Sequence, residues 1–192
     1  MVCLLSLGFF SVLNPCMSDE TLQIIDERNT GDYRATLGTE WRLVTDGVMG
    51  GVSSGKLLLE VKEGRHCLNL RGKVSLDNNG GFIQAALSLA PDGNYDASSF
   101  SGLLIDVYGN NQSYNIHLRT SDLWLPWQAY RQSFNATSEW QTYRLPFAGF
   151  DAYRTTTRLN VKKLKRIGVV AIGREFDADI CIGRMAFYRD IS

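Results

Sequence analysis

Apolar residues along the chain either alternate with polar residues or form short uninterrupted runs, and both patterns are typical of β-strands. Tyr114, Ile116 and Leu118 alternate with polar neighbours, which is the two-residue period of a half-buried strand. Residues 167–172 (IGVVAI) are continuously apolar, as expected for a central strand. Further segments of these two kinds are residues 22–26, 56–61, 66–76, 82–89, 102–108, 130–134, 140–147 and 180–188.

These segments predict about nine or ten strands, and no window of about 12 residues has the apolar stripe of an amphipathic helix. A doubly wound α/β domain is excluded, because it needs helices between its strands. Residues 78–81 (NNGG) predict a hairpin turn, since Asn and Gly tolerate positive φ. The whole pattern predicts an all-β fold, a β-sandwich or jelly roll in a single domain.

The N-terminal residues form a separate region. Residues 2–13 are uncharged and mostly apolar, but they are too few to span a bilayer as a helix. They have the length of the apolar part of a signal peptide, yet the first basic residue is Arg28. We expect an apolar tail or a degenerate signal segment over residues 1–20, and a β-sandwich domain over residues 21–192. A retained tail favours a cytoplasmic or peripheral-membrane location, whereas export follows if residues 1–18 act as a signal.

Charge is balanced over the whole chain but not along it. The 192 residues include 20 Lys and Arg and 20 Asp and Glu, so the net charge is zero. Nucleic-acid binding is not expected, because it needs a basic surface that displaces counterions. Residues 154–166 still form a basic run that could contact an acidic partner or a membrane surface, with a solvated loop as the alternative. Its basic members are Arg154, Arg158, Lys162, Lys163, Lys165 and Arg166.

The cysteines and histidines predict neither a metal site nor a cofactor. The four Cys contain no C-x-x-C pair, and His66 and His117 each lie in a strand pattern that favours a structural role. Cys67 and Cys181 lie inside apolar runs. Buried free thiols are therefore expected at these two positions, with a disulfide as the alternative.

Residues 46–55 (DGVMGGVSSG) are the densest motif of the chain. A glycine-rich loop can bind phosphate through its backbone N–H groups, as a dinucleotide-binding enzyme subunit would require. A P-loop, however, needs Lys followed by Ser or Thr and a helix, whereas Lys56 is followed by leucines. We expect a structural loop that passes close to another backbone, with Asp46 and Met49 available to a partner. No carboxylate pair or Ser–His–Asp triad is recognisable, so no catalytic residue is predicted.

Residues 123–130 (LWLPWQAY) form an aromatic cluster that is followed by Arg131. Trp124, Trp127 and Tyr130 are spaced three residues apart. Aromatic rings flanked by Gln and Arg can stack on sugar rings or contact a protein partner. The alternative is that these rings fill one end of the sandwich.

Five segments occur in an order that resembles one family. They are residues 46–55 (DGVMGGVSSG), 75–82 (SLDNNGGF), 125–134 (LPWQAYRQSF), 139–147 (EWQTYRLPF) and 166–180 (RIGVVAIGREFDADI). Together they resemble the CIA30 family, named after complex I intermediate-associated protein 30, over about residues 37–190. The resemblance implies a galactose-binding-like jelly roll. It also implies an assembly factor or chaperone for respiratory complex I (NADH:ubiquinone oxidoreductase), without catalytic residues.

The predicted function is that of a non-enzymatic binding protein whose partners are complex I subunits or assembly intermediates. The alternative is a protein like a carbohydrate-binding module that recognises a glycan through an aromatic and polar cleft. The candidate binding surface combines the glycine-rich motif, the neighbouring turn and the aromatic cluster. Its residues are Asp46, Met49, Gly50, Gly51, Ser53, Asn79, Arg119, Trp124, Trp127, Gln128, Tyr130 and Arg131.

Overall fold

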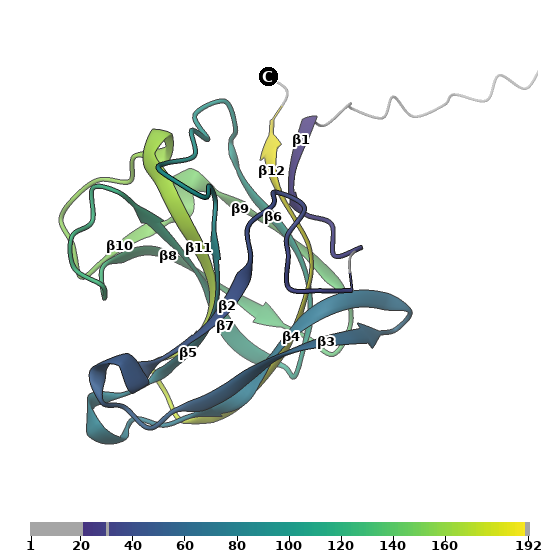
Figure 1. The fold of residues 1–192 in the computed structure, drawn as a ribbon, viewed down its shortest axis with the longest axis vertical. Helices are drawn as coiled ribbons and strands as arrows, with labels where there is room; N and C mark the ends of the chain where they lie inside the picture. Colours follow the sequence, from purple (N-terminus) through teal and green to yellow (C-terminus); the bar gives the residue numbers. More distant parts are fainter. Residues whose placement is uncertain (1–20, 30, 191–192) are drawn as a thin grey trace, which may run out of the picture.

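The computed structural model describes residues 21–29 and 31–190, which form two six-stranded antiparallel β-sheets (Figure 1). The first sheet has the order β3-β4-β12-β6-β9, and β1 also pairs with β12. Its strands are β1 (Thr21–Asp26), β3 (Ser54–Lys62), β4 (Arg65–Val74), β6 (Gly102–Gly109), β9 (Gln141–Pro146) and β12 (Phe176–Arg189). The predicted all-β sandwich is thus confirmed.

The second sheet has the order β10-β8-β7-β11-β5-β2. Its strands are β2 (Trp41–Thr45), β5 (Phe82–Ser88), β7 (Gln112–Thr120), β8 (Ala129–Ala136), β10 (Asp151–Tyr153) and β11 (Leu164–Ile172). Single turns of 3-10 helix lie between strands, namely η1 (Asp46–Met49), η2 (Asp77–Asn79), η3 (Phe147–Gly149) and η4 (Val161–Lys163). Val48 and Met49 of η1, together with Leu76 and Gly80 on either side of η2, border a hollow on the second sheet.

The core lies between the two sheets and follows the alternation of the strands. Tyr114, Ile116 and Leu118 on β7 are fully buried, as their two-residue period predicts. On β11 the inward residues are Ile167, Val169 and Ala171. Val170 points to the opposite face yet is also buried, because loops cover that face of the sheet. This explains why the β11 run is continuously apolar.

The segments expected to be strands are all strands, but the prediction missed two others. The described residues contain twelve strands rather than nine or ten. β2 and β10 were not predicted, and β10 has only three residues, too few to show a period. The prediction of a hairpin turn at residues 78–81 is wrong, because β4 before it and β5 after it belong to different sheets. Asn78 does adopt a positive φ of 55°, as expected for Asn in a turn.

The expectation of free thiols at Cys67 and Cys181 is also wrong. Cys67 on β4 and Cys181 on β12 form a disulfide with their Cα atoms 5.4 Å apart. The two strands are hydrogen-bonded neighbours, which brings together residues separated by 114 positions in the sequence. The disulfide therefore joins β4 to β12, the central strand of the first sheet.

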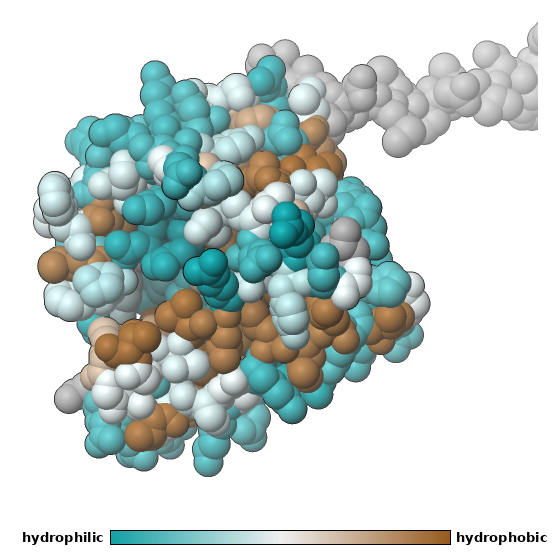
Figure 2. Space-filling view, viewed as in Figure 1, coloured by the Kyte–Doolittle hydropathy of each residue, from teal (hydrophilic) through white to brown (hydrophobic). Residues whose placement is uncertain are grey.

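The second sheet curves away from the first, and its outer face is hollowed. Figure 1 shows η1 and η2 below this face and the β10 region above it. Figure 2 shows the hollow between these two lobes, with hydrophobic residues on its lower rim and hydrophilic residues above. Ligand-binding sites of proteins occur preferentially in hollows of this kind.

Candidate functional site

The hollow is a cleft of about 550 Å³ on the outer face of the second sheet. Its floor consists of outward-facing side chains from β5, β7 and β11, among them Gln84, His117, Arg119 and Arg166. Gly168 gives the floor its shape, because a Cβ there would lie 2.0 Å from the Nε2 atom of Gln84. The Gln84 amide consequently lies across the floor, over β11.

One half of the cleft is cationic. Arg119 on β7 stands directly opposite Arg166 on β11 in the strand register. Burial lowers the pKa of Arg119, and the charge of Arg166 lowers it further. Burial also lowers the pKa of Arg166. Like charges that face each other on adjacent strands are destabilising, so this arginine pair carries an energetic cost.

His117 lies on the cleft floor beside the arginine pair. Burial lowers its pKa to about 4, and the charges of Arg131 and Arg119 act in the same direction. Its ring packs against that of Tyr153, with a centroid distance of 5.9 Å. In the part of the chain that the structure describes, the buried Nε2 atom of His117 has no hydrogen-bond partner. His117 is therefore a neutral residue that lines the cleft. It packs within the protein, as a structural side chain would, but its Nε2 atom is not used in a protein hydrogen bond.

Arg119 holds the aromatic segment at the rim of the cleft. Its Nη1 atom donates to the carbonyl oxygens of Leu125 at 2.9 Å, Pro126 at 2.7 Å and Gln128 at 2.5 Å. The side chain of Gln128 accepts a hydrogen bond from the Leu125 N–H at 3.1 Å. These bonds fix the loop, so that Trp127 and Gln128 line the cleft.

The three aromatic rings of this segment have different environments. Trp127 is 43% exposed and lines the cleft, whereas Trp124 is 91% exposed and lies outside it. Tyr130 is buried, and its hydroxyl donates to the Arg158 carbonyl oxygen at 3.0 Å. The expectation that these rings fill one end of the sandwich is therefore correct for Tyr130, which belongs to the core. It is wrong for Trp124 and Trp127, which are exposed. Arg131 is exposed, with its guanidinium 4.3 Å from the centre of the Tyr153 ring.

The other half of the cleft is apolar. Val48 and Met49 from η1 and Leu76 next to η2 line it and remain 74%, 45% and 48% exposed. The sheet contributes apolar side chains beneath them, which belong to Val44, Phe82, Val170 and Ile172. Exposed apolar side chains that gather at a cleft are typical of an interaction site.

Buried Asp46 joins the glycine-rich motif to the turn at residues 78–81. Its carboxylate accepts hydrogen bonds from the Ser53 hydroxyl and from the backbone N–H groups of Ser53, Gly81 and Phe82. Burial raises the pKa of Asp46, but these hydrogen bonds outweigh burial and leave the pKa below its ordinary value. Asp46 and Ser53 thus hold the two loops together and present Val48 and Met49 to the cleft.

Three glycines near Asp46 are required by the local geometry, two because they lie close to the Asp46 side chain and one because it ends η1 with a positive φ. A Cβ at Gly51 would lie 2.4 Å from the Asp46 Cγ, and one at Gly80 would lie 2.5 Å from the Asp46 Oδ2. Gly50 ends η1 with a φ of 89°, a conformation that glycine adopts without strain. Asn79 belongs to η2, but its side chain is outside what the structure describes.

The basic run does not form one surface. Arg154 and Arg166 line the cleft, whereas Lys163 forms an ion pair with Asp122 at 2.8 Å. The remaining three residues are exposed, namely Arg158, Lys162 and Lys165. The cleft is also lined by Gln84, His117, Tyr153 and Arg166, which the sequence pattern did not predict as site residues. The alternation of His117 and Arg119 on β7 was the available signal for a polar outer face.

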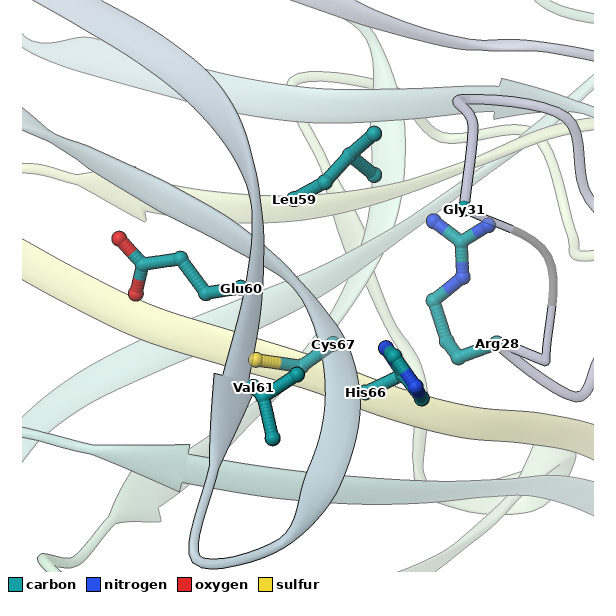
Figure 3. A pocket seen from close by; sticks show the side chains of 7 residues that line it. All are labelled: Arg28, Gly31, Leu59, Glu60, Val61, His66 and Cys67. Atoms are coloured by element: carbon teal, nitrogen blue, oxygen red, sulfur yellow. The ribbon is translucent and has the colours of Figure 1, made fainter.

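A second, smaller hollow of about 220 Å³ lies beside the disulfide and is lined by Arg28, Gly31 and residues of the β3–β4 hairpin (Figure 3). Its buried cation, Arg28, is already used within the protein, because its Nε lies 3.0 Å from the Asp26 Oδ2. Over residues 21–29 and 31–190, no group of three or more His, Cys, Asp or Glu is placed to hold a metal ion. The same residues include no helix with the length and hydropathy needed to cross a membrane.

Two antiparallel sheets, with a cleft on the outer face of one, define a β-sandwich of the type found in carbohydrate-binding modules. The family 11 module of the cellulase Lic26A-Cel5E of Clostridium thermocellum matches with a TM-score of 0.70 and 12% identity, over 90% of this chain and 96% of that one. The family 11 module from Clostridium thermocellum in complex with a β-1,3-1,4-mixed-linked tetrasaccharide gives 0.69 and 11%, over 89% and 97%. A family 30 module from a Clostridium thermocellum cellulase gives 0.53 and 13%, over 74% and 92%. At these identities the likeness shows the fold alone.

The chain belongs to the complex I intermediate-associated protein 30 (CIA30) family, which matches residues 32–182. The match confirms the resemblance and includes the motif at residues 46–55 and both loops around the cleft. A comparison with curated protein sequences gives no match.

Proposed function

We propose that the protein is a non-enzymatic binding protein that assists the assembly of respiratory complex I, with the cleft as its docking site. Family membership suggests the partner. The observation that carries the docking site is the exposure of Val48 and Met49 on a loop that buried Asp46 holds in place. A loop that is internally fixed yet presents apolar side chains to solvent suits recognition of another protein.

Affinity capture from the native membrane fraction, followed by mass spectrometry, tests this function. Wild-type protein is compared with Met49→Ser, which removes an apolar contact of the cleft, and with Lys73→Glu as a control. Lys73 is exposed on β4 in the other sheet. We expect complex I subunits to be enriched by wild-type and Lys73→Glu protein, and much less by Met49→Ser. Equal recovery with the wild type and both variants would place docking elsewhere, and no enrichment of complex I subunits would contradict the function.

A second candidate is glycan binding through the same cleft, which the half-exposed ring of Trp127 beside Gln128 favours. The mixed-linkage tetrasaccharide bound by the family 11 module provides a probe, since the two folds are alike. A glycan array that includes this tetrasaccharide is read with wild-type protein and with Trp127→Ala. Trp124→Ala is the matched control, because Trp124 lies outside the cleft. An array without signal removes this candidate.

A further inference from the structure

The charged side chains that line the cleft are of one sign. They belong to Arg119, Arg154 and Arg166, and the described lining contains no Asp, Glu or Lys. Within residues 21–29 and 31–190, the side chain of Arg166 makes no hydrogen bond or ion pair with a protein group. Arg119 uses its Nη1 atom on backbone carbonyls, none of which neutralises its charge. The cleft therefore contains half-buried positive charge without a counter-ion.

The register makes this charge suitable for a carboxylate. Arg119 and Arg166 are directly opposed on adjacent strands, so a single anionic group can contact both guanidinium groups. Such a group would remove the repulsion between them, and its own desolvation would be offset by charge-assisted hydrogen bonds. A neutral ligand would leave the repulsion in place. The cationic half thus favours an anion over a neutral ligand.

The apolar half and the composition of the cleft favour a protein as the source of that anion. Centres of protein interfaces are enriched in Arg, Met and aromatic residues and depleted of Lys, Glu and Asp. The cleft combines Met49, Trp127 and Phe82 with the arginines and has the same depletion. Met adapts its shape to varied apolar partners. A volume of about 550 Å³ accommodates a few side chains rather than a whole domain face.

We propose, building on the assembly function above, that the cleft binds a short segment of a partner protein in which an apolar side chain stands next to an Asp or Glu. The carboxylate binds between Arg119 and Arg166, and the apolar side chain packs on Met49 and Phe82. The cleft then recognises its partner by the distance between the carboxylate and the apolar side chain of the partner segment.

A random dodecapeptide library displayed on phage, panned on the purified wild-type protein, tests this proposal. Arg166→Glu protein serves for counter-selection, and circular dichroism melting establishes that it is folded; Arg166→Gln replaces it if it is not. We expect the selected peptides to share an Asp or Glu close to Leu, Ile, Met or Phe. Peptides selected without an acidic residue, or no enrichment over an uncoated surface, would overturn the proposal.

A selected peptide, made synthetically, is then titrated calorimetrically. Loss of the ion pair should weaken binding about tenfold or more in Arg166→Glu, and by a similar factor when the peptide acid is changed to its amide. Lys73→Glu has the same charge change on the other sheet and should leave the affinity unchanged. Equal affinity of wild-type and Arg166→Glu protein would overturn the proposal.

The proposal and the assembly function fail in different ways. If Arg166→Glu protein still captures complex I subunits and the selected peptides lack acids, the cleft chemistry is wrong and the assembly function stands. If acidic, apolar peptides are selected but wild-type protein captures no complex I subunit, the cleft chemistry stands and the partner belongs to another system.

Discussion

At the scale of single residues, buried polar groups fix the loops that border the cleft. Asp46 is fully buried and satisfies backbone N–H groups from both loops. Its carboxylate takes the place of a direct contact between the loop at residues 46–53 and the turn at residues 78–81. Val48 and Met49 can therefore stay exposed without loss of order in the loop. Residues that hold the loop in place and residues that face the cleft are thus interleaved in one motif.

Asp46→Ala should lower the free energy of unfolding by about 3 kcal/mol, because it leaves the N–H groups of Ser53 and Gly81 buried without a partner. Asp77→Ala, at an exposed acid in η2, is the control and should change it by less than about 0.5 kcal/mol. Urea unfolding followed by fluorescence measures both. Equal stability of the two variants would show that Asp46 does not clamp the loops.

The pKa of His117 gives a prediction about pH. Its folded-state pKa of about 4 lies below the ordinary value of 6.5 that it regains on unfolding. The stability linked to the neutral ring is therefore fully present above about pH 6.5 and is lost as the pH falls toward 4. Wild-type protein should lose more stability than His117→Gln between these two pH values in urea unfolding. Parallel losses would mean that His117 titrates normally in the folded protein.

At the scale of elements, the sequence pattern predicts where strands lie along the chain, but it does not predict which strands pair with each other. The period of β7 predicted both its buried face and its polar face, because alternation depends only on local geometry. The β4–β12 pairing that forms the disulfide could not be predicted, since strand order is decided by the whole sheet. The same limit applies to the arginine pair, which depends on the register of β7 against β11.

Removal of the disulfide tests the link between β4 and β12. Cys67→Ala/Cys181→Ala should lower the free energy of unfolding by roughly 4 kcal/mol, because the bond closes a loop of 114 residues in the unfolded chain. Urea unfolding of the oxidised wild type and the double variant measures this difference. Adding reductant should destabilise only the wild type. A double variant as stable as the wild type would contradict a structural role for the bond.

The contact between Arg119 and the aromatic loop at residues 124–128 gives a second prediction about elements. Arg119→Ala removes three hydrogen bonds that hold the carbonyls of residues 125–128 and should free the loop that carries Trp127. Amide hydrogen exchange in residues 124–128 should become faster, while exchange in β4 and β12 stays unchanged. Exchange that remains slow in the loop would show that other contacts hold it.

At the scale of the molecule, a carbohydrate-module-like sandwich in the CIA30 family carries a cleft that is cationic at one end and apolar at the other. The first sheet supplies the core and the disulfide, and the second supplies the floor of the cleft. Loops from separate parts of the sequence complete the site. The motifs at residues 46–55 and 125–134 therefore meet around one hollow, although a strand count alone does not predict it.

The most direct test of the central claim is complementation of a deletion strain, with assembled complex I measured by native gel electrophoresis and NADH dehydrogenase activity in the membranes. We expect deletion to lower assembled complex I, and wild-type and Lys73→Glu protein to restore it. Variants Met49→Ser and Arg166→Glu, expressed at equal levels, should restore it poorly. Normal complex I in the deletion strain, or full restoration by both cleft variants, would contradict assembly through this cleft.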